Sequence, residues 1–234
     1  MKLAPPQLTD AESTALLAEL DQVGSLDELQ PRPVHGVGNV LRLSEVRTVH
    51  RQQVTGRTFE DWRGRDSAVA QLKRLPAAGE IIHAITDGTY RGVDLIPAIL
   101  KLADATAVEL IVSTLSFSTG NIDVLARLLD EKQIRRAALV CSVYFRRTSE
   151  AAYTYAVAEL SKRNVQVTAN RVHAKIILLR TNAGHHIVVE SSANLRSCLC
   201  TEQVAVSDDR RLYQFHRCWL QHVITQTQQE AVSE

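Results

Sequence analysis

The segment from Arg171 to Asp208 reads RVHAKIILLRTNAGHHIVVESSANLRSCLCTEQVAVSD and sets the pattern for the rest of the chain. It contains two aliphatic runs, at 176–179 and 187–189, with Asn182 and Gly184 between them. An Asn-x-Gly turn between β-branched runs is typical of a hairpin. We therefore expect two antiparallel strands here, followed by a third short strand over 202–206.

Polar side chains occupy the ends of these two strands. Residues two apart on a strand share a face, so His173 and Lys175 are expected on one face, and Ser192 and Asn194 likewise. Antiparallel pairing would bring an imidazole, an ammonium, a hydroxyl and an amide to one end of the sheet. Such a set combines a nucleophile or base with groups that bind phosphate oxygens. The alternative for an isolated His-x-Lys pair is a solvated strand edge.

These residues resemble the signature of the phospholipase D superfamily, which is His-x-Lys, four residues, Asp, and then Gly-Ser-x-Asn. His173, Lys175, the SSAN element at 191–194 and the later Glu202 carry the resemblance. It extends from about residue 78 to the C-terminus and is strongest to the small bacterial endonucleases with a single signature. Two positions depart from the pattern, because Arg180 stands in place of Asp and Ser191 in place of Gly. In the family that Asp is generally a structural residue away from the reacting phosphate.

The resemblance implies an α/β fold, a phospholipase D-like mixed sheet flanked by helices on both faces, with an N-terminal α+β extension. It also implies a metal-independent phosphodiesterase that needs no cofactor, and above all a nuclease working through a phosphohistidine at a homodimer interface. His173 would be the nucleophile, Lys175, Asn194 and Ser192 would bind the phosphoryl oxygens, and Glu202 would orient the imidazole. Two alternatives remain open. One is a catalytically weakened fold that binds nucleic acid or protein, and the other is a phospholipid hydrolase.

The rest of the chain also indicates an α/β domain. Strands and helices are expected in alternation from Gly79, and such alternation favours a sheet covered on both faces. The expected strands span 80–85, 108–113, 137–143 and 165–169, and the expected helices span 93–102, 122–129, 150–163 and 210–223. We expect an extension over 1–76 with a helix at 8–23 and short strands at 34–54, the main domain over 77–226, and a flexible tail over 227–234.

Further candidates for substrate binding lie in two connecting segments. Ser116 and Ser118 follow an expected strand and precede a helix, where hydroxyls and free amides can hold an anion, although helix capping is the alternative. Arg146 and Arg147 follow an expected strand ending in Tyr144-Phe145 and could line a groove for a charged polymer. The alternative for this pair is an exposed loop.

The charge pattern bears on the partner. The formal net charge is +1, so any nucleic acid must be held by a local patch. The segment 42–74 carries eight Arg and Lys against four Asp and Glu, with His50, Phe59 and Trp62 interleaved. Such a segment can bind a phosphate backbone and stack bases; a solvated amphipathic helix over 59–75 is the alternative. We expect a nucleic-acid partner, DNA rather than RNA.

Cysteine usage and hydropathy bear on the compartment. The four cysteines include a Cys198-x-Cys200 pair that is too close for a zinc knuckle. We expect reduced thiols and a cytoplasmic protein. The chain has no apolar run approaching 18 residues, so no membrane partner is expected.

Overall fold

The computed structural model describes residues 57–77, 79–196 and 200–233. By its internal contacts the chain divides between Gln52 and Gln53, and all described residues belong to the second unit. The helix expected over 8–23 and the strands expected over 34–54 lie outside the described residues. The extension expected over 1–76 stays a prediction, and helix α2 (Arg57–Leu72) contributes Ala68 and Leu72 to the core of the second unit.

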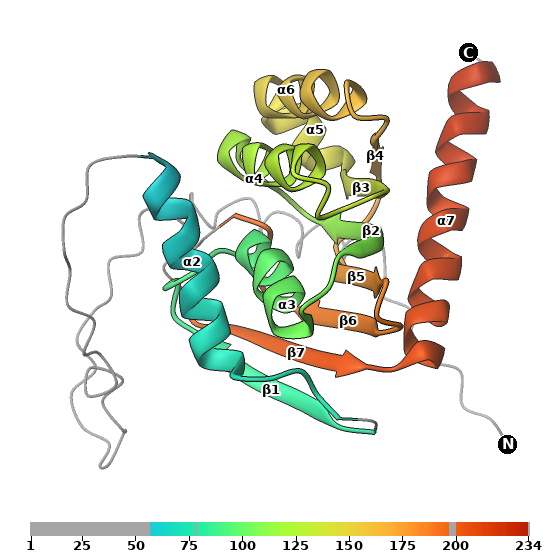
Figure 1. The fold of residues 1–234 in the computed structure, drawn as a ribbon. Helices are drawn as coiled ribbons and strands as arrows, with labels where there is room; N and C mark the ends of the chain where they lie inside the picture. Colours follow the sequence, from blue (N-terminus) through green and yellow to red (C-terminus); the bar gives the residue numbers. More distant parts are fainter. Residues whose placement is uncertain (1–56, 78, 197–199, 234) are drawn as a thin grey trace, which may run out of the picture. The chain divides into compact units, whose positions relative to one another are not determined.

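A seven-stranded mixed sheet forms the centre of this unit (Figure 1). The strand order is β1-β7-β6-β5-β2-β3-β4; β2, β3 and β4 run parallel, and every other neighbouring pair is antiparallel. The strands are β1 (Ile81–Thr86), β2 (Ala107–Thr114), β3 (Ala137–Ser142), β4 (Gln166–Asn170), β5 (Lys175–Thr181), β6 (His186–Ser191) and β7 (Glu202–Asp208).

Helices cover both faces of the sheet, which confirms the expected architecture. Besides α2 they are the 3-10 helix η2 (Gly92–Asp94), α3 (Leu95–Ala103), α4 (Thr119–Asp130), α5 (Val143–Thr148), α6 (Glu150–Ser161) and α7 (Arg210–Ser233). The larger core includes Ile177 and Leu179 of β5 together with residues of α3, α4 and α6. The neighbouring Ile176 and Leu178 face the other way, into a second core that α7 closes (Figure 1). Burial on both faces explains why β5 reads as a continuous aliphatic run.

The expected hairpin joins β5 to β6. Lys175 pairs with Ser191 at one end, and Arg180 pairs with His186 at the other. Gly184 in the connecting turn has a φ of 92°, a left-handed conformation that glycine adopts without a Cβ clash. This register places the polar ends of β5 and β6 together at one end of the sheet.

The segment after β3 differs from the expectation. A strand ending in Tyr144-Phe145 and then a loop were expected, but β3 ends at Ser142 and residues 143–148 form α5. The Ser142 side chain caps this helix by accepting a hydrogen bond of 3.1 Å from the Tyr144 amide. Phe145 is buried with its ring 4.6 Å from that of Phe117, centroid to centroid, and this packing holds the turn of helix against the core.

The C-terminal residues also differ from the expectation. A flexible tail was expected from residue 227, whereas α7 continues to Ser233. Asn170 Nδ2 donates a hydrogen bond of 2.9 Å to Thr227 Oγ1, and Gln228 Nε2 donates one of 3.1 Å to Gln166 Oε1. Polar composition alone predicted a tail, but these contacts dock the end of α7 onto the edge strand β4.

Candidate active site

His173 and Lys175 meet at the start of β5. The strand begins at Lys175, so His173 lies two residues before it and not on the strand as expected. The two side chains nevertheless approach, because Lys175 Nζ lies 3.1 Å from Nδ1 and 3.4 Å from Nε2 of His173. His173 is exposed and Lys175 is half-buried. The imidazole is thus accessible from outside while the ammonium is held beside it.

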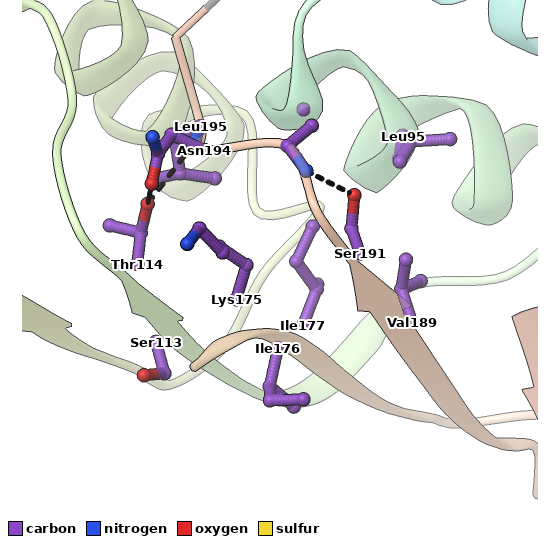
Figure 2. A pocket seen from close by; sticks show the side chains of 12 residues that line it. Leu95, Ser113, Thr114, Lys175, Ile176, Ile177, Val189, Ser191, Asn194 and Leu195 are labelled. Carbon is purple, nitrogen blue, oxygen red and sulfur yellow. Dashed lines mark hydrogen bonds between the residues drawn. The ribbon is translucent and has the colours of Figure 1, made fainter. Parts of the chain in front are cut away.

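Lys175 extends into a cavity at this end of the sheet. Figure 2 shows its side chain between Thr114 and Asn194 on one side and Ser191 on the other. Burial lowers the pKa of Lys175, and the nearby negative charge of Glu202 partly opposes that shift. A partly desolvated ammonium interacts more strongly with an anion than one in bulk water.

The orientation of Asn194 is fixed by β2. Its Oδ1 accepts hydrogen bonds from the Leu115 amide at 3.1 Å and from Thr114 Oγ1 at 3.4 Å. The Leu115 amide can only donate, so Oδ1 must face it, and the Nδ2 donors are on the other end of the Asn194 amide. Thr114 is itself buried and accepts a hydrogen bond of 3.2 Å from the Leu195 amide. Thr114 was missed in the sequence, although it directly follows the strand expected over 108–113.

Gly92 packs against the backbone of the Asn194 segment. The Val93 amide donates a hydrogen bond of 3.1 Å to the Leu195 carbonyl, which draws η2 against this segment. A Cβ at Gly92 would clash with the Asn194 carbonyl oxygen and would lie 3.2 Å from Leu195 Cα. The absence of a side chain at Gly92 therefore permits the packing that positions Asn194. No local sequence pattern marked this glycine, because the clash involves residues a hundred positions away.

Ser192 and Glu202 join the ends of β6 and β7. Ser192 Oγ donates a short hydrogen bond to Glu202 Oε2 and accepts one of 2.9 Å from the Gln203 amide. The expected bond from Glu202 to the His173 imidazole and the binding of phosphate by Ser192 both stay predictions. Ser191, at the position of the signature Gly, uses its Oγ to bond the Gln203 carbonyl and the Ala193 amide, each at 2.9 Å. The Ser191 hydroxyl therefore stabilises the backbone of the SSAN element at 191–194, where the signature has Gly.

The other candidates lie at the same end of the sheet. Ser118 caps α4, with its Oγ accepting a hydrogen bond of 3.3 Å from the Asn121 amide, so the capping alternative has direct support. Ser116 is buried in the turn between β2 and α4. Arg146 and Arg147 are exposed on α5, and the Arg146 guanidinium lies 5.6 Å from the centroid of the Tyr153 ring. Substrate binding by these four residues stays a prediction.

Arg180, in place of the signature Asp, lies away from the site. It is five residues beyond Lys175 along β5, roughly 16 Å at the usual rise, and its side chain is on the opposite face. There its Nε lies 4.0 Å from Oε2 of Glu109, which also accepts hydrogen bonds from Arg217 Nε at 2.8 Å and from the Tyr213 hydroxyl at 2.7 Å. Burial opposes ionisation, but Arg217, Tyr213 and Arg180 outweigh it and lower the pKa of Glu109. Arg180 thus belongs to a cluster of polar and charged side chains around Glu109, between the sheet and α7.

The described residues show no metal centre and no membrane span. Within 57–77, 79–196 and 200–233, no three His, Cys, Asp or Glu side chains are grouped to hold a metal ion. No helix in this part of the chain is long and apolar enough to cross a bilayer. The reactive groups at the candidate site are the imidazole of His173, the ammonium of Lys175 and the amide of Asn194, at one end of the sheet.

Comparisons with known proteins find likeness in solved structures. No family model and no curated protein matches the chain. Nuc from Salmonella typhimurium, described as a phospholipase D family member, is 15% identical over 63% of this chain and 95% of its own, with a TM-score of 0.48. Polyphosphate kinase from Porphyromonas gingivalis is 11% identical over 64% of this chain and 28% of its own, with a TM-score of 0.48.

A third similar structure is a DNA-binding protein. TrmBL2, an archaeal chromatin protein, is 10% identical over 73% of this chain and 65% of its own, with a TM-score of 0.41. The description of Nuc names the family that the signature residues resemble. At these scores the matches carry no weight for function, which has to rest on the residues of this chain.

Proposed function

We propose that the chain is a phosphodiesterase, and specifically a nuclease that cleaves nucleic-acid strands without a metal ion. The observation that carries the proposal is the convergence of His173, Lys175 and Asn194, with Lys175 Nζ 3.1 Å from His173 Nδ1. An imidazole can attack phosphorus, while an ammonium and an amide N–H can neutralise and bind the non-bridging oxygens.

The proposed reaction needs two imidazoles. His173 of one subunit attacks phosphorus, the P–O bond to the leaving strand breaks, and His173 of the partner subunit gives its proton to the leaving oxygen. The second imidazole then takes a proton from water, and the resulting hydroxide attacks the phosphohistidine and breaks the P–N bond. One chain carries a single copy of His-x-Lys, so a twofold homodimer would supply the second copy.

Lys175 has two roles in this scheme. Without substrate its ammonium donates to a ring nitrogen of His173. A phosphate oxygen is a stronger acceptor for an ammonium than an imidazole nitrogen is. Substrate binding would therefore draw the ammonium to phosphate and leave the imidazole nitrogen ready to attack.

Nucleic acid is the proposed substrate, and DNA before RNA. The exposed Arg146 and Arg147 lie at the same end of the sheet, and the sequence has a basic stretch over 42–74. The alternative of a catalytically weakened binding protein rests on Arg180 in place of the signature Asp and on the modest net charge of +1. Arg180 lies beside Glu109 on the other face of the sheet, and this location supports the catalytic proposal.

The test is cleavage in excess EDTA of single- and double-stranded DNA and RNA and of bis(p-nitrophenyl) phosphate. His173→Ala should lower turnover by at least about 10²- to 10⁴-fold, with circular dichroism unchanged. His222→Ala is the matched control, since it is an exposed histidine on α7, over the other face of the sheet. EDTA-resistant cleavage that survives His173→Ala would refute the mechanism.

Subunit mixing tests the composite site separately. When wild type and His173→Ala are mixed and allowed to exchange, only wild-type pairs have two imidazoles. Activity should then follow the square of the wild-type fraction, giving about a quarter of full activity in an equal mixture. A linear dependence, with about half of full activity, would show that each subunit works alone.

A further inference from the structure

An exposed aromatic side chain lies on α5, directly after β3. Tyr144 is 67% exposed, whereas its neighbour Phe145 is 4% exposed and packed in the core. Among the aromatic side chains that the structure describes, only Tyr144 and Phe215, which is 65% exposed, are exposed to this degree. Single exposed aromatics are common on proteins, so the location of Tyr144 decides its meaning.

Tyr144 lies at the same end of the sheet as Lys175. Ser113 of β2 pairs with Ile176, so Thr114 lies level with Lys175, and Thr114 pairs with Cys141 of β3. Strands are about 4.8 Å apart, which puts Cys141 roughly 10 Å from Lys175. Three further residues at up to 3.8 Å each place Tyr144 within roughly 20 Å of Lys175. A few nucleotides can span that distance.

Helix α5, which carries Tyr144, also lies on the face of the sheet that carries the Lys175 side chain. Val143 and Phe145, the neighbours of Tyr144, pack in the larger core, together with Ile177 of β5. Ile177 shares its face with Lys175, because the two are separated by two residues on one strand. A ligand bound at Lys175 therefore reaches α5 without crossing the sheet.

The surroundings of Tyr144 are basic. Arg146 and Arg147 are exposed on the same helix, and Arg171 is exposed on the segment that leads from β4 to His173. The nearest acidic residue along the chain, Glu150, opens α6 and is also exposed. The chain segments next to Tyr144 thus carry three exposed guanidiniums and one exposed carboxylate, a local positive charge that suits a nucleic-acid backbone.

We propose that Tyr144 stacks on a base of single-stranded nucleic acid, and that Arg146 and Arg147 contact its backbone on the way to Lys175. Aromatic platforms beside cationic side chains are how proteins bind single strands, since every unpaired base offers a π-face. The bases of a duplex are stacked on each other, so a lone tyrosine has no base to receive except at an end. The inference deepens the proposed function by naming its substrate as single-stranded, and it rests on that function.

The experiment measures binding by fluorescence anisotropy in EDTA, with a labelled 12-nucleotide single strand and the matching duplex. Every protein carries His173→Ala so that the strands stay intact. Tyr144→Ala should weaken single-strand binding by about 5- to 100-fold and duplex binding by less than about twofold. Tyr144→Phe keeps the ring and should bind as the parent does. Phe215→Ala, an equally exposed aromatic on α7, should change neither affinity.

Several outcomes would overturn the inference. Among them are unchanged single-strand binding in Tyr144→Ala, an equal loss for duplex, or no single-strand binding by the parent protein. A change in sedimentation coefficient on Tyr144→Ala would instead place this residue in a protein–protein interface and would equally overturn it.

Cleavage of bis(p-nitrophenyl) phosphate by proteins with His173 intact separates this inference from the proposed function. If wild type cleaves it and Tyr144 has no effect on strand binding, only the inference fails. If strand binding depends on Tyr144 but nothing is cleaved, only the proposed function fails.

Discussion

Replacing Gly92 by alanine tests how tightly the structure determines the position of Asn194. The added Cβ would clash with the Asn194 carbonyl oxygen and lie 3.2 Å from Leu195 Cα. Both neighbours are backbone atoms and cannot rotate away. Restoring a normal separation requires a displacement of roughly 1 Å. Because the Leu115 amide bonds Asn194 Oδ1 at 3.1 Å, a displacement of this size in the Asn194 backbone would distort that bond and change the position of the side-chain amide.

Two magnitudes follow for Gly92→Ala. Overpacking should cost about 1–3 kcal/mol of stability, which for a chain of this size lowers Tm by roughly 2–12 °C. A 1 Å misplacement of a substrate-positioning group costs on the order of 10²-fold in rate. The stability effect depends only on the packing, and the rate effect depends also on the proposed function.

The assay combines thermal unfolding with kcat and KM for bis(p-nitrophenyl) phosphate in EDTA. Gly120→Ala is the matched control, because the nearest atoms to its Cβ would be 3.9 Å away. Gly120→Ala, in the first turn of α4, should instead raise the free energy of unfolding by about 0.5–1 kcal/mol. If Gly92→Ala were as stable and active as wild type, the close approach of η2 to Asn194 would be refuted.

Three further changes test the second face and the end of α7. Glu109→Gln should lose about 1.5–3 kcal/mol at pH 7, since charged hydrogen bonds from Arg217 and Tyr213 are weakened. Folding lowers the pKa of Glu109. The stabilisation by the Glu109 carboxylate is therefore complete above its unfolded pKa of about 4.3 and is lost as pH falls through its folded pKa. The difference in Tm between wild type and variant should close over that pH range. Arg180→Asp restores the signature residue, yet it should leave kcat unchanged. It should lower the stability, because it removes the 4.0 Å pair and puts a second carboxylate beside the buried Glu109; a gain in kcat would contradict the placement of Arg180 outside the site. Deleting residues 227–234 removes two hydrogen bonds to β4 and should cost about 1–2 kcal/mol in urea unfolding, whereas an unchanged midpoint would restore the expectation of a tail.

Local sequence patterns predicted most of the described elements. The aliphatic runs around Asn182 and Gly184 predicted the hairpin, because a glycine turn and β-branched flanks act within a few residues. The alternation of strands and helices after Gly79 likewise predicted the sheet with helices on both faces. The same local logic was wrong for α5 and for the end of α7, where burial of Phe145 and the bond from Asn170 to Thr227 overrode composition.

The sequence by itself determined which reactive groups the site could contain, since an imidazole, an ammonium and an amide at fixed spacing are properties of the chain. It also predicted that the hairpin would bring them to one end of a sheet. The expected placement on the strands was wrong for His173, which precedes β5, and for Ser192 and Asn194, which follow the end of β6 at Ser191. Only the tertiary structure decided that Thr114 contacts the side chain of Asn194 and that Gly92 leaves room for its backbone. Only the tertiary structure, too, decided that Arg180 belongs to a cluster with Glu109 on the other face. These contacts join residues about 70 to 100 positions apart, and their existence depends on strand register and backbone packing, which no local pattern encodes.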